Sequence, residues 1–481
     1  MIRVLDAGLH RLELHTRIPF RYGIATLTQA PHLILRLELE VNGRQSAGLA
    51  ADNLVPKWFS KDPAQSYEDE LAAMLDVIRQ AVHIALEAGP WPTVFQAWQH
   101  VYAAQRAWAQ QTPHPPLLWQ FGVSLVERAL IDAFCRAENI TFAEAVRGNP
   151  LGIDLGRIHS ELAGLQPALL LPASPTPALF VRHTVGMLDP LAEADIPEHQ
   201  RLDDGLPQSL EAAIQRYGLR YFKVKLSGKA ETDVERLQAV VHLLERLVPD
   251  YACTLDGNEQ FDDVDALRNF WEQLRGVPAL SSLLDNLLFV EQPLRRDVAL
   301  SDATASRLLA WPERPPLIID ESDAELHSLP RALAAGYAGT SHKNCKGVFK
   351  GIANACLLAY RRQQRPEQPA ILSGEDLTNV GPIALHQDLA VMATLGLEHV
   401  ERNGHFYIGG LEHFPSAWQQ LCLRHHPDLY VQRARDAPAL LIRNGHLSLN
   451  SILKQPFGTA PALDCTDCPT LSLDSPVVLP L

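Results

Sequence analysis

The stretch Tyr221-Phe-Lys-Val-Lys-Leu226 places two lysines on one face of a short strand, because successive side chains of a strand point to opposite faces. Further short strand-like runs each end in a charged residue, and these residues are Asp256, Glu291, Asp320 and Lys343. From Lys225 onwards they are 31, 35, 29 and 23 residues apart. A barrel of about 250 residues with eight βα units averages about 31 residues per unit. The series therefore predicts one charged residue at the end of each consecutive strand.

Strands that alternate with amphipathic helices predict parallel βαβ units from residue 183 onwards. The predicted strands are Tyr221–Leu226, Ala252–Leu255, Leu287–Val290, Leu317–Ile319, Gly339–His342 and Ala370–Leu372. So many units in succession favour a closed (β/α)8 barrel, and an open doubly wound sheet is the alternative. The chain has neither GxGxxG at a strand end nor GxxxxGK[ST], so it lacks both usual nucleotide-binding signatures.

The N-terminal part has the pattern of an α+β unit. Apolar and polar residues alternate from Leu33 to Val41, and Asn42-Gly43 predicts a tight hairpin turn. Helical periodicity follows in three segments, 67–88, 94–109 and 123–137. We expect this unit to end near Gly148 and the Pro-, Ala- and Leu-rich segment 162–177 to be a connecting loop.

Composition and charge exclude several functions. The chain of 481 residues has 42 Lys and Arg against 56 Asp and Glu, a formal charge of −14, which is the wrong sign for a nucleic acid partner. No run approaches the roughly 20 uninterrupted apolar residues of a membrane helix, and the first residues lack a signal-peptide core. We therefore expect a cytoplasmic protein with no membrane partner. Cys465 and Cys468 form a CxxC without a second pair, which favours an ordinary reduced tail over a metal site.

Three carboxylates at neighbouring strand ends would converge at the mouth of a barrel and repel one another unless a cation neutralised them. Oxygen ligands with open positions suit Mg²⁺. Each residue alone has an ordinary alternative, since an Asp or Glu after a strand is often a helix cap and Lys223 could be an edge-strand charge. Lys343 could likewise precede a helix that uses Lys346 and Lys350 for solubility. The ordered series and the paired lysines favour the metal site.

Together these residues resemble the enolase superfamily, specifically its muconate-lactonizing-enzyme-like branch, the mandelate racemase/muconate lactonizing enzyme family. The segment 19–23 resembles the substrate-capping loop of that family, and 444–447 resembles its closing C-terminal strand. The matching barrel motifs are Lys223-Val-Lys225, Asp256-Gly-Asn258, Glu291-Gln-Pro293, Asp320-Glu321-Ser322, and Lys343 ahead of Gly347 to Gly351.

The resemblance implies a modified (β/α)8 TIM-type barrel with an α+β N-terminal capping domain that the C-terminal segment completes. On this basis we expect the capping domain at 1–150, a connecting segment at 151–182 and the barrel at 183–430. The C-terminal segment, 431–481, would return to the cap.

The resemblance also implies a role for each site residue. Asp256, Glu291 and Asp320 would bind an essential Mg²⁺, while Lys225 and Lys343 would act as acid and base on opposite faces of the substrate, with Lys223 assisting electrostatically. The candidate substrate-binding residues are Arg21, Tyr22, Lys57, Asn258, Glu321 and Asp376. Two features depart from the family pattern. The stretch after Lys343 lacks the adjacent glycine pair, and 373–376 matches the seventh strand end only with an uncertain register.

The implied reaction removes the proton next to the carboxylate of a small-molecule substrate, and Mg²⁺ would stabilise the resulting enediolate. Lysines on both faces favour a racemase or epimerase. A lyase, either a dehydratase or a syn elimination like that of o-succinylbenzoate synthase, and a cycloisomerase are alternatives on the same site. A non-catalytic binding barrel is the alternative from another class. The absence of His-x-His at a strand end disfavours a metal-dependent hydrolase. The chain could also form a homo-oligomer.

Overall fold

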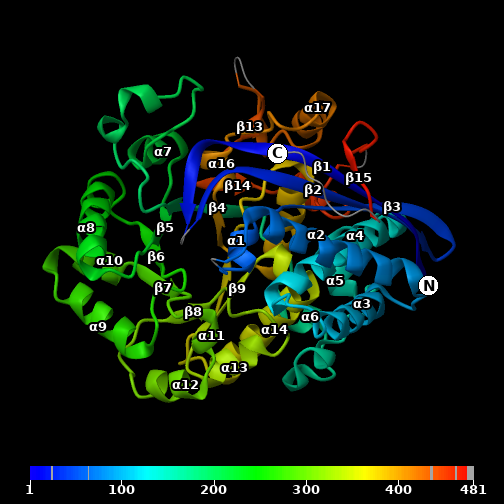
Figure 1. Cartoon of the computed structure of the whole chain (residues 1–481), viewed down its shortest axis with the longest axis horizontal. Helices are drawn as coiled ribbons and strands as arrows, with labels where there is room; N and C mark the ends of the chain where they lie inside the picture. The colour runs from blue at the N-terminus through cyan, green and yellow to red at the C-terminus, as the bar shows by residue number, and fades with distance from the viewer. Residues whose placement is uncertain (23–24, 63, 434–436, 461–462, 474–481) are drawn as a thin grey trace.

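A closed barrel of parallel strands forms the larger part of the molecule, with a capping sheet and its helices packed against it (Figure 1). This computed structural model describes residues 1–22, 25–62, 64–433, 437–460 and 463–473. Pairing of the last barrel strand with the first closes the barrel, which excludes an open doubly wound sheet. The eight barrel strands in the described part of the chain are β4 (Ala178–Val185), β5 (Tyr221–Lys225), β6 (Ala252–Asp256), β7 (Leu287–Glu291), β8 (Leu317–Ile319), β9 (Gly339–His342), β10 (Ile371–Gly374) and β11 (His399–Arg402).

Helices follow the barrel strands and cover the outside of the barrel (Figure 1). The amphipathic α9 shows why: it buries Leu267, Phe270 and Leu274, which recur at helical spacing on one face. The helices are α7 (Leu210–Tyr217), α8 (Ala230–Leu247), α9 (Val264–Arg275), α10 (Ser281–Asp285), α11 (Arg296–Ala299), α12 (Asp302–Leu309), α13 (Ser328–Ala334), α14 (Val348–Gln364) and α15 (His386–Leu395), the last preceded by a π-helical turn, η7 (Gly381–Leu385).

The capping unit is an antiparallel sheet backed by helices, as the alternating N-terminal pattern predicts. Its strands are β1 (Ile2–Tyr22), β2 (Ala25–Val41), β3 (Arg44–Asn53) and the C-terminal β15 (Thr470–Leu471). The Asn42-Gly43 turn joins β2 to β3 with positive φ angles of 51° and 79°. The helices are α1 (Pro56–Phe59), α2 (Tyr67–Glu87), α3 (Val94–Ala109), α4 (Pro116–Glu138) and α5 (Phe142–Gly148). Helix α4 starts at Pro116, earlier than the predicted Val123, and it is the buried centre of this unit.

The C-terminal segment returns to both parts of the molecule, as the family resemblance implies. Strand β14 (His446–Ser448) pairs antiparallel with the start of β4, and β15 pairs with β1 in the cap. The remaining elements are α6 (Pro167–Leu170), α16 (Gly404–Tyr407), α17 (Ser416–His425), β12 (Tyr430–Val431) and β13 (Ala439–Leu440). Cys465 and Cys468 are buried free thiols beside β15. Among the described residues, no helix combines the length and apolar character needed to span a bilayer.

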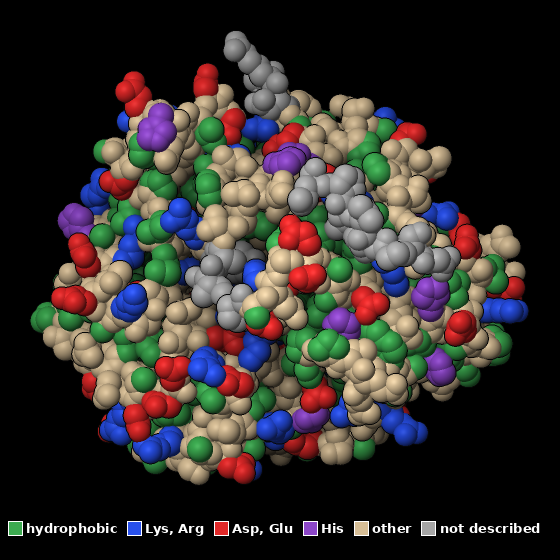
Figure 2. All heavy atoms as spheres, viewed as in Figure 1, with side chains coloured by type: hydrophobic (Ala, Val, Ile, Leu, Met, Phe, Trp, Pro, Cys, Tyr) green, Lys and Arg blue, Asp and Glu red, His purple; other side chains and the backbone are tan. Residues whose placement is uncertain are grey.

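Two barrel strands were not predicted from the sequence. Strand β4 begins at Ala178, inside the range 151–182 that we expected to connect the two parts, and β11 follows α15. Both carry buried charges, Arg182 on β4 and Glu401 and Arg402 on β11, so neither reads as an apolar run. The basic side chains of Lys and Arg and the acidic side chains of Asp and Glu are interspersed over the molecular face in Figure 2.

Candidate active site

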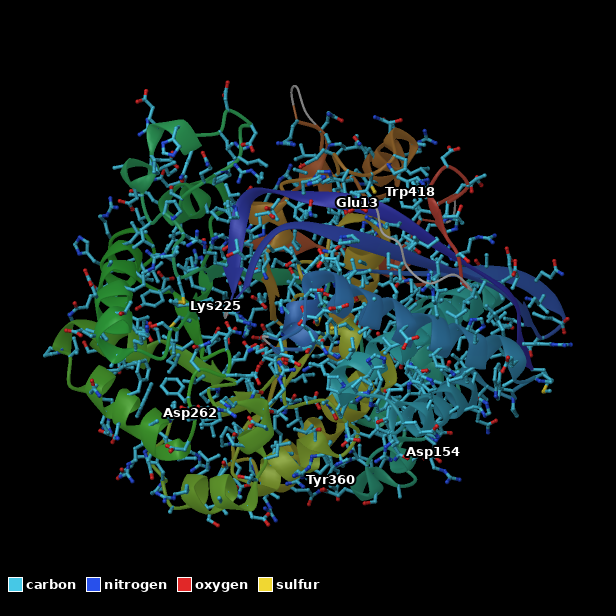
Figure 3. The ribbon with its side chains drawn as sticks, in the orientation of Figure 1. Glu13, Asp154, Lys225, Asp262, Tyr360 and Trp418 are labelled. Atoms are coloured by element: carbon cyan, nitrogen blue, oxygen red, sulfur yellow. The ribbon has the colours of Figure 1, made fainter. Side chains whose placement is uncertain are left out.

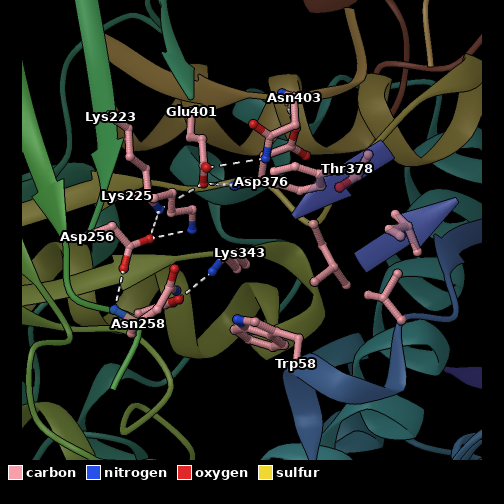
Figure 4. Close-up of a pocket in the computed structure, with 15 residues that line it drawn as sticks. Trp58, Lys223, Lys225, Asp256, Asn258, Lys343, Asp376, Thr378, Glu401 and Asn403 are labelled. Atoms are coloured by element: carbon pink, nitrogen blue, oxygen red, sulfur yellow. Dashed lines mark hydrogen bonds and ion pairs between the residues drawn. The ribbon is translucent and has the colours of Figure 1, made fainter. Parts of the chain in front are cut away.

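A pocket of about 440 Å³, part of it open to solvent, lies where the C-terminal ends of the barrel strands face the cap (Figure 4). This end of a (β/α)8 barrel is where side chains from separate strands converge. Lys225 lies at this boundary, between the barrel strands and the cap (Figure 3). The pocket is lined by Phe20, Leu27, Val55, Trp58, Lys223, Lys225, Asp256, Asn258, Asp320, Lys343, Asp376, Leu377, Thr378, Glu401 and Asn403.

Lys223 is buried at the floor of the pocket among four carboxylates. Its Nζ donates to Glu291 Oε1 at 3.0 Å, Glu375 Oε2 at 2.7 Å and Glu401 Oε2 at 3.1 Å, and it lies 2.9 Å from Asp256 Oδ2. Burial lowers the pKa of Lys223, but these carboxylates outweigh burial and hold the pKa well above its ordinary value. The ammonium group therefore stays charged and holds the acidic strand ends together.

Lys225 shares the inward face of β5 with Lys223, because every second side chain of a strand points to the same face. Its Nζ donates to Asp256 Oδ2 at 2.7 Å, and Asp256 Oδ1 accepts from the backbone N–H of Asn258 at 2.9 Å. Burial raises the pKa of Asp256, and the two lysines outweigh it, so the pKa of the carboxyl is lowered. Asp256 is thus an oriented carboxylate at the pocket.

Lys343 reaches the pocket from β9. Its Nζ donates to Asp320 Oδ2 at 2.5 Å and lies 4.4 Å from the centre of the Trp58 indole ring. Burial lowers the pKa of Lys343, but Asp320 outweighs burial and raises the pKa above its ordinary value. In the barrel, β6, β7 and β8 separate β9 from β5 on one side, and β10, β11 and β4 separate them on the other. Lys225 and Lys343 therefore project from opposite sides of the barrel mouth.

Lys346 and Lys350 are buried, so the interpretation that they serve solubility is wrong. Lys346 Nζ lies 3.2 Å from Asp320 Oδ1 and donates to the carbonyl oxygen of Ser341 at 2.7 Å. Lys350 Nζ lies 3.3 Å from Asp323 Oδ1. Asp320 is thus bound on one oxygen by Lys343 and on the other by Lys346, which fixes its orientation.

Asp256, Glu291 and Asp320 supply the oxygen donors that suit a hard cation, although each carboxylate is bound by a lysine in this structure. All three are buried carboxylates on successive strand ends, and Glu291 Oε2 lies 2.8 Å from Lys223 Nζ. Burial and the neighbouring Asp256 and Glu375 raise the pKa of Glu291 well above its ordinary value, so additional positive charge would be favourable there. In the part of the chain that the structure describes, no three His, Cys, Asp or Glu side chains gather closely enough to hold a metal ion. Lysine ammonium groups instead lie between the carboxylates.

The site residues that were missed from the sequence include Glu375, Glu401 and Asn403. Glu375 and Glu401 both bind Lys223, and Asn403 lines the pocket. The seventh strand end thus contributes two adjacent acids. Glu375 faces the lysine, whereas Asp376 lines the pocket and accepts from the backbone N–H groups of Asn379 and Asn403 at 2.6 and 2.9 Å. Burial raises the pKa of Asp376 to about 7.

The predicted substrate-binding residues are only partly brought together. Asn258 and Asp376 line the pocket. Arg21 is exposed on β1, and Lys57 Nζ is 2.9 Å from Glu70, so the structure places both outside the pocket lining. Glu321 is buried beside the pocket, 4.0 Å from Lys61 Nζ. The side chain of Tyr22 lies outside the described part of the chain.

The cap is fastened to the barrel on two sides of the pocket. Arg296, after β7, donates to the carbonyl oxygens of Phe59 and Trp58 at 2.9 and 3.1 Å and to Glu259 Oε1 at 2.7 Å. On the other side, Asn53 Nδ2 donates to the carbonyl oxygen of Thr378 at 2.8 Å. These contacts hold Trp58 over the strand ends.

No model of a known protein family and no curated protein sequence matches the chain. Solved structures share its fold over nearly the whole length. An N-succinyl Arg/Lys racemase from Bacillus cereus is 15% identical with a TM-score of 0.57 and covers 94% of this chain and 98% of its own. A muconate lactonizing enzyme from Pseudomonas fluorescens, complexed with muconolactone, is 16% identical with a TM-score of 0.56 and covers 93% and 94%. An enolase from Bradyrhizobium, complexed with magnesium and mandelic acid, is 14% identical with a TM-score of 0.54 and covers 93% of both chains.

Proposed function

We propose that the chain is an enzyme of the enolase superfamily, in its muconate-lactonizing-enzyme-like branch, that removes the proton next to a substrate carboxylate with the aid of Mg²⁺. The observation that carries the proposal is the position of Lys225 and Lys343 on opposite sides of the barrel mouth, with Asp256, Glu291 and Asp320 on the strands between them. The names of the structures that share the fold, a racemase, a lactonizing enzyme and an enolase, support the same chemistry.

Asp256, Glu291 and Asp320 would hold the metal. Bound Mg²⁺ supplies positive charge that stabilises the negative charge developing on the substrate carboxylate. Lys343 must lose its proton to act as a base, and its ion pair with Asp320 opposes this loss. When the Asp320 carboxylate is engaged elsewhere, burial remains and lowers the pKa of Lys343 toward the working pH. Lys346 stays on the other oxygen of Asp320 and keeps the carboxylate in place.

Among the reactions this site can perform, we favour racemisation or epimerisation. One lysine takes the α-proton from its side of the substrate, and the protonated lysine opposite returns a proton to the other side, which inverts the carbon with no net change in atoms. Loss of a β-group after the first step would make the protein a lyase. If the protein catalysed the reverse of an addition to a double bond, it would be a cycloisomerase.

Solvent deuterium exchange tests the proposal. The protein is incubated in D₂O with Mg²⁺ and both enantiomers of N-acyl amino acids, dipeptides and acid sugars, and α-deuterium is followed by NMR. We expect the wild type to interconvert enantiomers. Lys343→Ala and Lys225→Ala should abolish interconversion, and each should keep exchange of one enantiomer, with opposite preferences. Lys229→Ala, which removes an exposed lysine near β5, serves as the control and should behave as the wild type.

Three results would contradict this assignment. Equal exchange of both enantiomers in both lysine variants would exclude opposed bases. Binding of Mg²⁺ and carboxylates without exchange of any of them would identify a binding barrel. Complete loss of elimination in one lysine variant, with partial loss in the other, would identify a lyase that uses a single base.

A further inference from the structure

The lining of the pocket divides into a charged floor and an apolar roof. The floor comes from the barrel strand ends and includes Lys223, Lys225, Asp256, Asp320 and Lys343. The roof is defined by five apolar side chains, each at most 7% exposed: Phe20, Leu27, Val55 and Trp58 of the cap, and Leu377 after β10. In Figure 4, Trp58 and the cap strands face the floor residues across the pocket.

Three cationic side chains of the cap near this roof are engaged elsewhere, and Arg21 on β1 is exposed and does not line the pocket. Arg17 Nε lies 2.6 Å from Asp204 Oδ2, and its Nη1 donates to the carbonyl oxygens of Pro207 and Phe406 at 2.9 Å. Lys57 is paired with Glu70, and Lys61 is paired with Glu259. Each of these lysines and arginines therefore already has a counter-charge.

The acidic lining residues Asp376 and Glu401 also already have hydrogen-bonding or ion-pair partners. Both oxygens of Asp376 accept backbone N–H groups, and Arg402 Nη1 lies 3.4 Å from Asp376 Oδ1. Glu401 binds Lys223 through Oε2 and accepts from Thr184 Oγ1 at 2.6 Å through Oε1. A substrate with a second charge, of either sign, would therefore meet no unpaired counter-charge among the described lining residues.

We propose that the substrate is a monocarboxylate whose α-carbon carries an uncharged, apolar substituent, either aromatic or branched aliphatic, that packs under Phe20, Leu27, Val55, Trp58 and Leu377. The inference rests on the proposed function, because the reacting carboxylate and α-carbon must lie on the floor between Lys225 and Lys343. The rest of the substrate then points to the roof.

Neutral hydrogen-bonding groups complete the lining. The side-chain oxygens of Asn258 and Asn403 are buried and accept no hydrogen bond from the described residues. An α-hydroxyl or an acylated α-amino group of the substrate could donate to either one without adding charge. The substrate class is accordingly an α-hydroxy or N-acyl carboxylate with an apolar substituent.

The test compares substrates matched in shape and different in charge. N-acetyl-leucine is paired with N-acetyl-aspartate, and N-acetyl-methionine with N-acetyl-lysine. Deuterium exchange at the α-carbon and calorimetric binding in the presence of Mg²⁺ are measured for each. We expect kcat/KM for exchange to be at least about 100-fold higher for the apolar member of each pair, because an unpaired charge is strongly disfavoured in an apolar site.

Charge introduced into the roof should shift this preference. Leu27→Lys places an ammonium group under the cap, and Leu377→Lys does so from the barrel side, so the result does not depend on one variant folding. Either variant should reduce the preference for N-acetyl-leucine over N-acetyl-aspartate by at least about 10-fold. Leu5→Lys makes the same change at an exposed position of β1 and should leave the preference unchanged.

The outcomes separate the substrate class from the proposed function. Exchange of the charged members at rates equal to the apolar ones overturns the substrate class and supports the proposed chemistry. Preferential binding of the apolar members without any exchange supports the substrate class and overturns the chemistry. Failure of every apolar member to bind in the millimolar range overturns the substrate class.

Discussion

Glu291 is the residue whose replacement most directly tests the metal site. It is buried, its Oε2 lies 2.8 Å from Lys223 Nζ, and burial with the nearby Asp256 raises its pKa. Glu291→Gln keeps the size of the side chain and removes one anionic ligand. Mg²⁺ affinity should fall by at least about 10- to 100-fold, since even outer partners of metal ligands contribute that much. Titration calorimetry measures the affinity, with the exposed Glu313→Gln as control; equal affinities in the two variants would reject the site.

His32 makes the stability of the cap depend on pH. Its Nδ1 is 2.7 Å from Asn53 Oδ1, and burial lowers its pKa from 6.5 to about 4. The neutral ring's contribution to stability is therefore complete above pH 6.5 and is lost as the pH falls toward 4. The asparagine in His32→Asn does not titrate. The free energy of unfolding of the wild type minus that of this variant should therefore fall by about 2 kcal/mol between about pH 7 and about pH 5. Denaturant unfolding of both proteins at both pH values measures this difference in free energy, and a difference that is the same at the two pH values would refute the effect.

Single residues were predictable where their position along a strand determines their surroundings. Lys225, Asp256 and Asp320 could be placed because each ends a strand of a barrel, where side chains converge. Arg21 and Lys57 could not be placed, because the direction of a cap side chain depends on packing between two units. Trp58 reaches the pocket, whereas its neighbour Lys57 turns to Glu70.

Strand β3 and helix α4 approach each other so closely that only glycine fits between them. A Cβ atom at Gly48 would overlap the carbonyl oxygen of Ala129, and Ser46 Oγ already donates to the carbonyl oxygen of Ala133 at 2.9 Å. Gly48→Ala should lower the free energy of unfolding by at least about 2 kcal/mol. Gly276→Ala is the control, because its φ of −73° suits alanine and the nearest atom would be 3.4 Å away. Equal stability of the two variants in urea would show that the strand can move.

Elements were predictable where hydrophobic patterning alone determines them. Strands β5 to β9 have short apolar or neutral runs before a charge, and the cap hairpin alternates regularly. Strand β4 was hidden because Arg182 and His183 are buried in it, and β11 because Glu401 and Arg402 are half of its residues. Their charges are compensated by partners from distant strands, such as Glu375 for Arg182, which a local pattern does not contain.

The pocket is complete only while the cap is packed against the barrel. Arg296 is one of the residues that hold the cap there. Arg296→Met removes the donors to the carbonyl oxygens of Trp58 and Phe59. Amide exchange of Ser60, whose N–H bonds within the same turn, should accelerate roughly 10- to 100-fold. Arg295→Met, which changes an exposed neighbour, is the control. Equal exchange at Ser60 in both variants would show that the cap is held without Arg296.

The pairing of β15 with β1 joins parts of the chain that are made far apart in time. His10 Nδ1 lies 3.3 Å from the carbonyl oxygen of Cys468, 458 residues later, and Leu9 pairs with Leu471. At ribosomal speeds this separation corresponds to roughly 20 to 90 s during which one edge of β1 has no partner. An open strand edge is a template for pairing with other chains. The part of the β1 edge around Leu9 and His10 therefore stays open to pairing with other chains until the last residues have been made.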